Sequence, residues 1–356
     1  MTLHIALDAT LDDAPTTGIG LYGRELGSAL ESMGHRVERM GAERSGDVPR
    51  GAMSRTVWTL AVLPRLLASR PLFHAIGNFN LPLRPPAGSR CVLTVHDLIP
   101  LTHPETVSRA FRWQFRLWLS RALEVAAHVI CPSAHTEQEL LAHFPQVMGR
   151  TTVVHHGVDH VLREEDAAEA RALVDAMDLP QRPVVYAGSL DVRKNVALVL
   201  DALERLGPAV PLVLVGQRWF GSGPVEERIT SLQRQGFDVR ALGHQPTGVY
   251  REVLRRAGAF AFPSLAEGFG LPPLEAMALG VPVVISDAGA LPEVCGDAAL
   301  QVSAHDAQAL ADALSTLRGE SEAARARRVQ RGLEWSARFT WKAAAERTTQ
   351  VYIGAG

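Results

Sequence analysis

Short apolar runs rich in β-branched residues alternate with longer amphipathic stretches along the whole chain. This alternation is typical of βαβ units, which build parallel sheets. Twelve runs are predicted as strands, at 3–9, 35–41, 72–77, 90–97, 127–133 and 151–157, and then at 183–189, 211–217, 238–244, 259–264, 282–288 and 299–304. Two sets of six strands indicate two doubly wound α/β domains rather than one very large sheet.

One long segment between the two sets lacks a strand pattern. Residues 159–183 are rich in charged side chains, and no apolar run occurs before the one that starts at residue 183. A domain boundary is therefore expected inside this segment. We expect domains over 1–165 and 166–335, and the remaining residues, 336–356, are predicted to be helical because aromatic and aliphatic residues recur among charged ones.

The composition excludes several classes of protein. The chain has 356 residues, 47% of them hydrophobic, and a formal net charge of −2, so nucleic acid is not expected as a partner. Its three cysteines, Cys91, Cys131 and Cys295, are widely spaced and indicate neither a disulfide framework nor a metal site. A strand begins too early to leave room for a signal peptide, and no apolar run reaches the roughly 18 residues of a membrane span. A cytoplasmic protein is expected.

The most informative stretch is Glu267–Glu275, EGFGLPPLE, which follows a predicted strand and leads into a helix. Gly268 and Gly270 let the backbone approach a ligand closely, and Pro272 or Pro273 suits a first helical turn. The N–H groups and the positive dipole end of such a helix bind phosphate readily. The stretch therefore predicts an anion site.

A carboxylate stands at each end of this anion site. Glu267 and Glu275 cannot themselves bind phosphate, but carboxylates accept hydrogen bonds from sugar hydroxyls. The alternative is that Glu275 only stabilises the helix dipole and that Glu267 is a solvated loop charge.

Two adjacent cations, Arg193 and Lys194, occupy the loop after the first strand of the second half. Loops that follow parallel strands converge on one edge of the sheet, so this pair is expected close to the loop of Glu267. Alone, such a pair is commonly a solvated surface feature. Beside a glycine-rich anion site, a bound diphosphate explains it better.

These motifs together resemble the retaining nucleotide-sugar glycosyltransferases of family 4, which have the GT-B fold. The resemblance covers essentially the whole chain and rests on GSLDVRKN and FPSLAEGFGLPPLEAMALGVPVVISD in the second half, and on TGIGLYGREL, TVHDLIPLTHP and VVHHGVD in the first. It implies two Rossmann-like domains facing a central cleft, with the acceptor bound by 1–165 and the nucleotide-sugar donor by 166–335. The helix at 336–356 is expected to cross back to the first domain.

The resemblance implies that Lys194 and Arg193 bind the donor diphosphate. Many relatives carry a Gly-Arg pair after the preceding strand, with the arginine on phosphate. Here that position is Ser189, which leaves open whether Arg193 takes over the role. The loop around Gly243 would lie against the nucleotide base.

Roles also follow, by resemblance, for the glycine-rich loop. Glu275 would bind the ribose hydroxyls and Glu267 would face the transferred sugar. The amides of Phe269, Gly270 and Leu271 would hold sugar or phosphate.

A histidine at a strand end, His96 in TVHD, is expected at the reacting centre near the sugar and the acceptor, with Asp97 able to orient its ring. A purely structural role is the alternative. His155 and His156 are weaker candidates, and no histidine spacing indicates a metal site.

The stretch GIGLYG, residues 18–23, spells the glycine fingerprint of an NAD site, with Glu38 about 20 positions later. The first glycine of that fingerprint should follow its strand at once, whereas Thr10–Thr17 intervene here. An NAD-dependent oxidoreductase is therefore disfavoured. The amides of Gly18 and Gly20 are expected instead to approach the donor phosphates or the acceptor, and a simple helix entry is the alternative.

The expected reaction is transfer of a hexose, of mannose or rhamnose type, from a nucleoside diphosphate sugar to an acceptor hydroxyl with retained configuration. By resemblance alone, the donor is a GDP-sugar, and the acceptor is a glycan or a lipid-linked molecule of surface polysaccharide assembly. No Asp-x-Asp sequence is present, so neither a metal nor another cofactor is expected. The alternatives are a small-molecule acceptor, or a catalytically weak subunit that only binds sugar nucleotides.

Residues 109–128 form a separate feature. Arginines alternate there with Phe111, Trp113 and Leu117 in a predicted helix. Such a helix either lies on an anionic membrane surface, at the inner face of the membrane, or covers the first sheet with its arginines reaching solvent.

Overall fold

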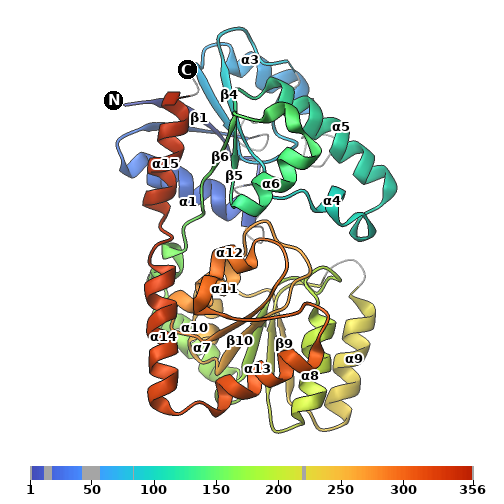
Figure 1. The fold of residues 1–356 in the computed structure, drawn as a ribbon. Coiled ribbons are helices and arrows are strands. Elements are labelled where there is room, and N and C mark those ends of the chain that lie inside the picture. Colours follow the sequence, from blue (N-terminus) through green and yellow to red (C-terminus); the bar gives the residue numbers. More distant parts are fainter. Residues whose placement is uncertain (1, 12–17, 42–56, 83, 219–221, 355–356) are drawn as a thin grey trace. The chain divides into compact units, whose positions relative to one another are not determined.

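The computed structural model describes residues 2–11, 18–41, 57–82, 84–218 and 222–354. The chain forms two compact units, a first unit of residues 1–157 and 340–356 and a second unit of residues 158–339 (Figure 1). The bounds differ by a few residues from the expected 1–165, 166–335 and 336–356. The N–H of Val158 donates to the carbonyl of Phe339 over 2.9 Å, which joins the start and the end of the second unit.

The first unit contains a six-stranded parallel sheet in the order β2-β1-β3-β4-β5-β6. Its strands are β1 (His4–Asp8), β2 (Arg36–Met40), β3 (Leu72–Ala75), β4 (Arg90–Thr94), β5 (His128–Cys131) and β6 (Thr151–Val153). Helices α1 (Gly18–Ser32) and α15 (Trp341–Gly354) bury their apolar residues on one face of this sheet. Helices α3 (Leu63–Leu67), α5 (Arg109–Val125) and α6 (Ala134–His143) do so on the other, and α4 (Ile99–Thr102) follows β4.

The second unit repeats this architecture, with the strand order β12-β11-β10-β7-β8-β9. Its strands are β7 (Val184–Ala187), β8 (Leu212–Val215), β9 (Val239–Gly243), β10 (Ala259–Phe262), β11 (Val283–Ser286) and β12 (Leu300–Val302). Helices α8 (Val196–Leu206), α9 (Gly223–Arg234) and α13 (Ala307–Gly319) share one core with the sheet. The remaining helices are α7 (Ala167–Ala176), α10 (Thr247–Arg255), α11 (Leu271–Ala278), α12 (Leu291–Cys295) and α14 (Glu322–Ser336).

Each of the twelve predicted runs contains one strand, and both sheets are parallel, so the predicted doubly wound α/β class is confirmed. Buried parallel strands read as apolar runs because helices cover both of their faces. Of the loop whose length disfavours an NAD site, residues 12–17 lie outside the described part of the chain.

The last helix, α15, is tied to the first sheet by a buried polar network. His74 Nδ1 contacts the Tyr352 hydroxyl at 2.7 Å, and its Nε2 contacts Thr94 Oγ1 at 2.8 Å. The Tyr22 hydroxyl of α1 lies 3.0 Å from the same threonine oxygen. Burial lowers the pKa of His74 to about 3, so the ring is neutral and the network carries no charge at neutral pH.

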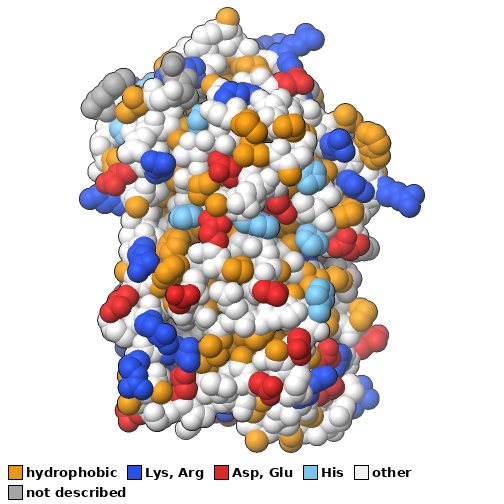
Figure 2. Space-filling view, in the orientation of Figure 1, with side chains coloured by type: hydrophobic (Ala, Val, Ile, Leu, Met, Phe, Trp, Pro, Cys, Tyr) orange, Lys and Arg blue, Asp and Glu red, His pale blue; other side chains and the backbone are white. Residues whose placement is uncertain are grey.

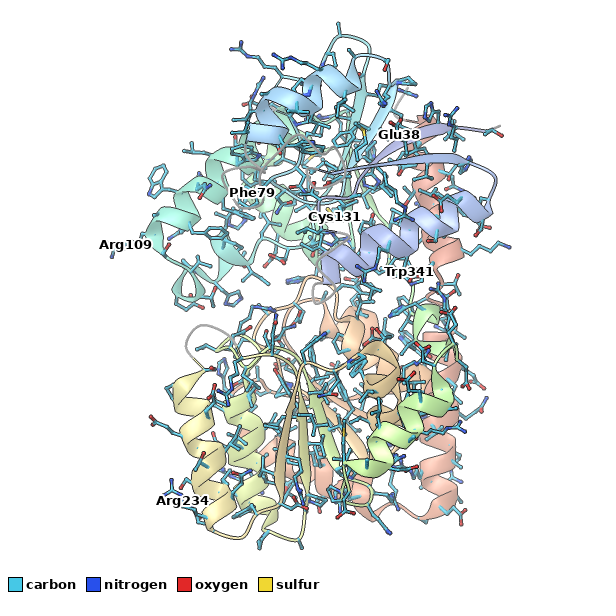
Figure 3. The ribbon with its side chains drawn as sticks, turned by 180° about the vertical axis from the view of Figure 1, so that it is seen from behind. Glu38, Phe79, Arg109, Cys131, Arg234 and Trp341 are labelled. Atoms are coloured by element: carbon cyan, nitrogen blue, oxygen red, sulfur yellow. The ribbon has the colours of Figure 1, made fainter. Side chains whose placement is uncertain are left out.

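Glu38, the acidic residue of the NAD-like fingerprint, lies in β2 (Figure 3). Its Oε2 accepts a hydrogen bond from Arg70 Nε over 2.8 Å, and this bond holds the pKa of the Glu38 carboxyl below its usual value. The carboxylate is thus bound within the first unit.

Candidate functional site

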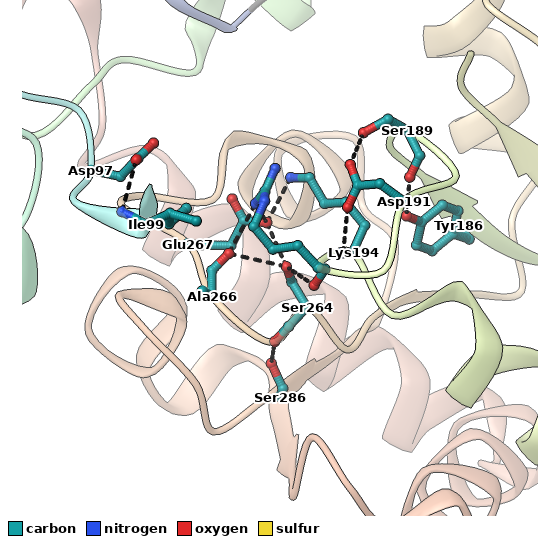
Figure 4. Close-up of polar contacts among 11 residues, drawn as sticks. Asp97, Ile99, Tyr186, Ser189, Asp191, Lys194, Ser264, Ala266, Glu267 and Ser286 are labelled. Carbon is teal, nitrogen blue, oxygen red and sulfur yellow. Dashed lines mark hydrogen bonds and ion pairs between the residues drawn. The ribbon is translucent and has the colours of Figure 1, made fainter. Parts of the chain in front are cut away.

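Three of the predicted site residues meet at the carboxyl ends of two neighbouring strands of the second unit. Arg193 and Lys194 lie between β7 and α8, and Glu267 lies between β10 and α11. One carboxylate oxygen, Glu267 Oε1, accepts from Lys194 Nζ at 2.6 Å and from Arg193 Nη1 at 3.0 Å (Figure 4). The predicted proximity of the cationic pair and the glycine-rich loop is therefore present, and we call these three residues the cation–carboxylate cluster.

Hydrogen bonds from neighbouring residues complete the cluster. Ser264 Oγ donates to the same Glu267 oxygen at 2.7 Å, and Arg193 Nη1 also donates to the Ala266 carbonyl at 2.9 Å. The Leu265 N–H in turn donates to the Arg193 carbonyl at 2.8 Å. These hydrogen bonds, from side chains and backbone, hold the loop of Arg193 and the loop of Glu267 in one arrangement.

The loop of Lys194 has its own supports. Asp191 Oδ1 accepts from the Lys194 N–H at 2.9 Å, and Asp191 Oδ2 accepts from Ser189 Oγ at 2.6 Å. Asn195 has a left-handed backbone with φ of 55°, and its amide donates to the carbonyls of Pro263 and Ala304. The chain can therefore turn sharply into α8 while the two cations stay next to Glu267.

Burial and charge act against each other in the cluster. Burial by itself raises the pKa of Glu267, but the charges of Lys194 and Arg193 outweigh it, and the pKa is lowered overall. Burial also lowers the pKa of Lys194, an effect that Glu267 opposes and Arg193 reinforces. The side chains of Lys194 and Glu267 are only 13% and 10% exposed, so the ionic interactions are weakly screened by water.

The glycine-rich loop ends at the N-terminus of α11. Gly270 has φ of 105°, and a Cβ at this position would lie 2.6 Å from Leu291 Cδ2, so the conformation requires glycine. Pro272 and Pro273 have no N–H groups, which limits the donors expected at this helix end to the amides of 269–271.

The hydrogen-bond partners of Glu275 do not belong to the cation–carboxylate cluster. It is buried in α11, where Oε2 accepts from the Tyr250 hydroxyl at 2.7 Å and Oε1 lies 3.0 Å from His160 Nε2. Both partners were absent from the sequence-based prediction. His160 follows the motif VVHHGVD directly, which is a weak signal, whereas no motif surrounds Tyr250.

Two further predicted residues of the second unit lie at strand ends. The Ser189 hydroxyl is used as a donor to Asp191, next to Lys194. Gly243 ends β9 with φ of 70°, and its carbonyl accepts from the Gly216 N–H at 2.9 Å.

His96 belongs to the first unit, where it follows β4. Its Nε2 contacts the Ile76 carbonyl at 2.8 Å, and a carbonyl only accepts, so this nitrogen carries the proton. The ring lies edge-on to Tyr22 at 5.0 Å and 5.4 Å from the ring of His156. Burial lowers the pKa of His96 to about 4, so the imidazole is neutral and its Nδ1 is an acceptor at neutral pH. Asp97 accepts from the Ile99 N–H at 3.1 Å.

The glycines of GIGLYG form the start of α1 in the first unit. Gly18 is exposed, and among the described residues an added Cβ would meet no atom from another part of the chain within 4 Å, while Gly20 is buried. The expected role of Gly18 and Gly20 toward a ligand stays a prediction.

A buried carboxylate that the sequence did not single out, Asp8, lies at the end of β1. Its oxygens accept from Thr10 N and Thr10 Oγ1 at 3.0 and 2.6 Å and from Asn80 Nδ2 at 2.6 Å. The Ile76 backbone also bonds to it. Asp8 therefore joins the loop after β1 to the loop after β3, and Ile76 of the second loop also contacts His96.

Replacing Asp8 by asparagine is expected to remove a pH dependence of the free energy of unfolding. Burial raises the pKa of Asp8 from 3.8 to about 6. Stabilisation from this group is complete below about pH 4 and is lost as the pH rises through 6, because the folded state then holds a desolvated charge. The difference in unfolding free energy, Asp8→Asn minus wild type, should grow by about 2–3 kcal/mol between pH 4 and pH 7.5. Urea denaturation over this range measures it, and a difference independent of pH would contradict the assignment.

The three cysteines have the properties of inert core residues rather than of reactive thiols. Cys91, Cys131 and Cys295 are free and buried, and burial raises the pKa of the Cys91 thiol to about 12. Across the residues that the structure describes, no group of three or more His, Cys, Asp or Glu side chains is placed to hold a metal ion.

Comparison with known proteins covers both units. Residues 16–162 match the family model "Glycosyltransferase Family 4", and residues 181–319 match "Glycosyl transferases group 1". The O-antigen chain mannosyltransferase B of Escherichia coli is 31% identical over 283 residues, which is 77% of this chain and 72% of that protein.

Two solved structures resemble this chain over nearly its full length. The sucrose-phosphate synthase of Thermosynechococcus elongatus has a TM-score of 0.75 and 25% identity, with 99% of this chain and 98% of that one covered. Anabaena HepE in complex with UDP-glucose has a TM-score of 0.73 and 19% identity, with 99% and 100% covered. The predicted GT-B fold class is confirmed.

Proposed function

Because the chain belongs to glycosyltransferase family 4, we propose that it moves a hexose from a nucleoside diphosphate sugar to an acceptor hydroxyl with retention of configuration. A mannosyl-type donor, with a GDP-sugar favoured, and an acceptor from surface polysaccharide or glycolipid assembly are the specific form of the proposal. The similarity to an O-antigen mannosyltransferase supports it.

The observation that carries the proposal is the cation–carboxylate cluster beside the N-terminus of α11. Lys194 and Arg193 supply two positive charges where the loops after β7 and β10 meet, and α11 adds the positive end of its dipole. A diphosphate carries the complementary charge. On binding, it would share the cations with Glu267, and the carboxylate would then accept hydrogen bonds from the sugar.

Glu275 is proposed to bind the ribose. Tyr250 and His160 each occupy one of its oxygens, and a carboxylate oxygen can accept a second hydrogen bond. The two protein partners would thus fix the carboxylate while leaving acceptor capacity for the two ribose hydroxyls.

In the proposed reaction, the bond from the anomeric carbon to the diphosphate oxygen breaks as the bond to the acceptor oxygen forms. The acceptor proton passes to an oxygen of the departing diphosphate. Negative charge grows on that group, and Lys194 and Arg193 are already positioned to stabilise it, which is usually the largest catalytic contribution of an enzyme. The protein's own cations would then serve in place of a metal ion.

His96 is proposed to accept a hydrogen bond, through Nδ1, from a hydroxyl of the sugar or the acceptor. With a pKa of about 4, it should stay neutral from about pH 5 upward. We expect its ¹⁵N ring signals, assigned by comparison with His96→Gln, to remain those of a neutral imidazole down to about pH 5, and His96→Gln to lower kcat. Titration of His96 near pH 6.5 would contradict the buried-acceptor assignment.

The proposed function is tested by incubating the protein with GDP-, UDP-, ADP- and dTDP-sugars and measuring nucleoside diphosphate release with and without oligosaccharide acceptors. NMR of the product then gives its anomeric configuration. We expect release with one class of donor and a product of retained configuration. Binding of a donor without any release or transfer would instead support a catalytically weak subunit.

A further inference from the structure

The inner face of helix α5 packs against the first sheet. Phe115, Leu119, Ala122 and Leu123 are buried against the first sheet. Phe79 extends this contact, with its ring centroid 5.9 Å from that of Phe115 and 6.1 Å from those of Phe111 and Trp118 (Figure 3). The role of covering the sheet therefore belongs to this face.

The outer face of α5 carries large apolar side chains that are mostly exposed. Trp113 is 67% exposed and Leu117 is 64% exposed. Residues four apart lie one turn apart on the same side of a helix, so the two form a continuous apolar ridge. Covering the sheet does not require this ridge.

Arginines flank the ridge on both sides. At 100° per residue, Arg109, Arg112 and Arg116 fall on one flank of Trp113 and Leu117, and Arg121 falls on the other. Figure 2 shows blue and orange side chains intermingled at the edge of the first unit that carries α5.

The charged side chains of α5 are mostly positive. Four arginines stand against one acidic residue, Glu124, whose Oε2 is 2.6 Å from Arg121 Nη1. Within the described residues, Arg109, Arg112 and Arg116 form no ion pair. A net positive helix on a chain of net charge −2 is an asymmetry that favours a polyanionic surface as partner.

We propose that α5 docks the protein on an anionic phospholipid surface, with Trp113 and Leu117 inserted at the headgroup–acyl boundary. The arginines would then contact lipid phosphates while their aliphatic stems cover the ridge. Two apolar side chains among cations make too small a patch for a stable protein–protein interface, which needs about 800 Å² from each partner. An aromatic and an aliphatic residue between cations suit the membrane interface instead. This docking proposal is independent of the proposed glycosyl transfer.

Vesicle flotation without donor or acceptor tests the proposal. Vesicles of equal parts phosphatidylglycerol and phosphatidylcholine should carry the protein at low ionic strength, and vesicles of phosphatidylcholine alone should not. The double variant Trp113→Ser/Leu117→Ser should bind at least about tenfold more weakly, since its apolar contribution is lost. The variant Arg109→Glu/Arg116→Glu should lose binding, and high salt should weaken binding of the wild type.

Matched controls keep the outcome specific. Met148→Ser removes an apolar side chain that is 71% exposed elsewhere on the first unit, and Arg234→Glu reverses an exposed charge of α9. Both should bind as the wild type does, and all variants should keep its melting temperature. Equal binding to both vesicle types, or unchanged binding of the Trp113→Ser/Leu117→Ser variant, would overturn the proposal. So would conversion of an oligomer to a monomer by that variant in sedimentation, because the ridge would then be a protein interface.

Discussion

Replacing Lys194 by alanine is expected to lower kcat for glycosyl transfer by about 100- to 1000-fold, the loss seen when a preorganised charge-stabilising group is removed. Lys194 Nζ lies 2.6 Å from Glu267 Oε1 in a nearly buried cluster, next to the start of α11. Without it, the departing diphosphate would keep one cation, Arg193, while the carboxylate remained nearby. Initial rates at saturating donor measure the effect directly.

The chain offers an unusually matched control for this substitution. Lys194 and Lys342 are its two lysines, and the side chain of Lys342 is 78% exposed in α15 of the first unit. Lys342→Ala should leave kcat unchanged, and Lys194→Arg should recover part of the activity because it keeps the charge. A Lys194→Ala protein with a wild-type melting temperature and near-normal kcat would remove this residue from the catalytic account.

Replacing Glu275 by glutamine should lower kcat/KM for the donor by about 10- to 100-fold, as expected when a hydrogen bond loses its charged acceptor. The amide oxygen can still accept from Tyr250, so the fold of α11 should be kept. The lost interaction is the one proposed with the ribose hydroxyls, and the effect should appear mainly as a higher KM. Steady-state kinetics over a range of donor concentration separate KM from kcat.

Tyr250→Phe provides the comparison for Glu275. It removes a positioning hydrogen bond of 2.7 Å but leaves the carboxylate charge, so its effect on KM should be smaller than that of Glu275→Gln. If Glu275→Gln changed the melting temperature but left KM at the wild-type value, a role for Glu275 in dipole stabilisation alone would be the better explanation.

Most of the fold could be predicted because local pattern and tertiary burial agree. The run 183–189 became β7, Val184–Ala187, and the polar residues at its end left the sheet to form the loop of Ser189 and Asp191. The same holds for 90–97, where β4 ends at Thr94 and His96 lies beyond it. Strand ends were therefore overestimated where a polar residue follows the apolar run.

Part of the candidate site could be predicted for a topological reason. Arg193 and Glu267 are 74 residues apart in sequence, but parallel strands place the loops after β7 and β10 at the same sheet edge. The partners of Glu275 could not be found this way. His160 is 115 residues from Glu275, and Tyr250 comes from a helix face without a recognisable motif. Likewise, the raised pKa of Asp8 depends on burial that no local pattern reveals.

The central claim is that Lys194, with Arg193, binds a nucleoside diphosphate in the second unit. Calorimetric titration of GDP, UDP, ADP and dTDP, and of the corresponding nucleosides, into wild type, Lys194→Ala and Lys342→Ala tests it most directly. The account predicts that at least one diphosphate binds far more tightly than its nucleoside, that Lys194→Ala weakens this binding at least about tenfold, and that Lys342→Ala does not. Equal affinity of Lys194→Ala and wild type for the diphosphate would contradict it.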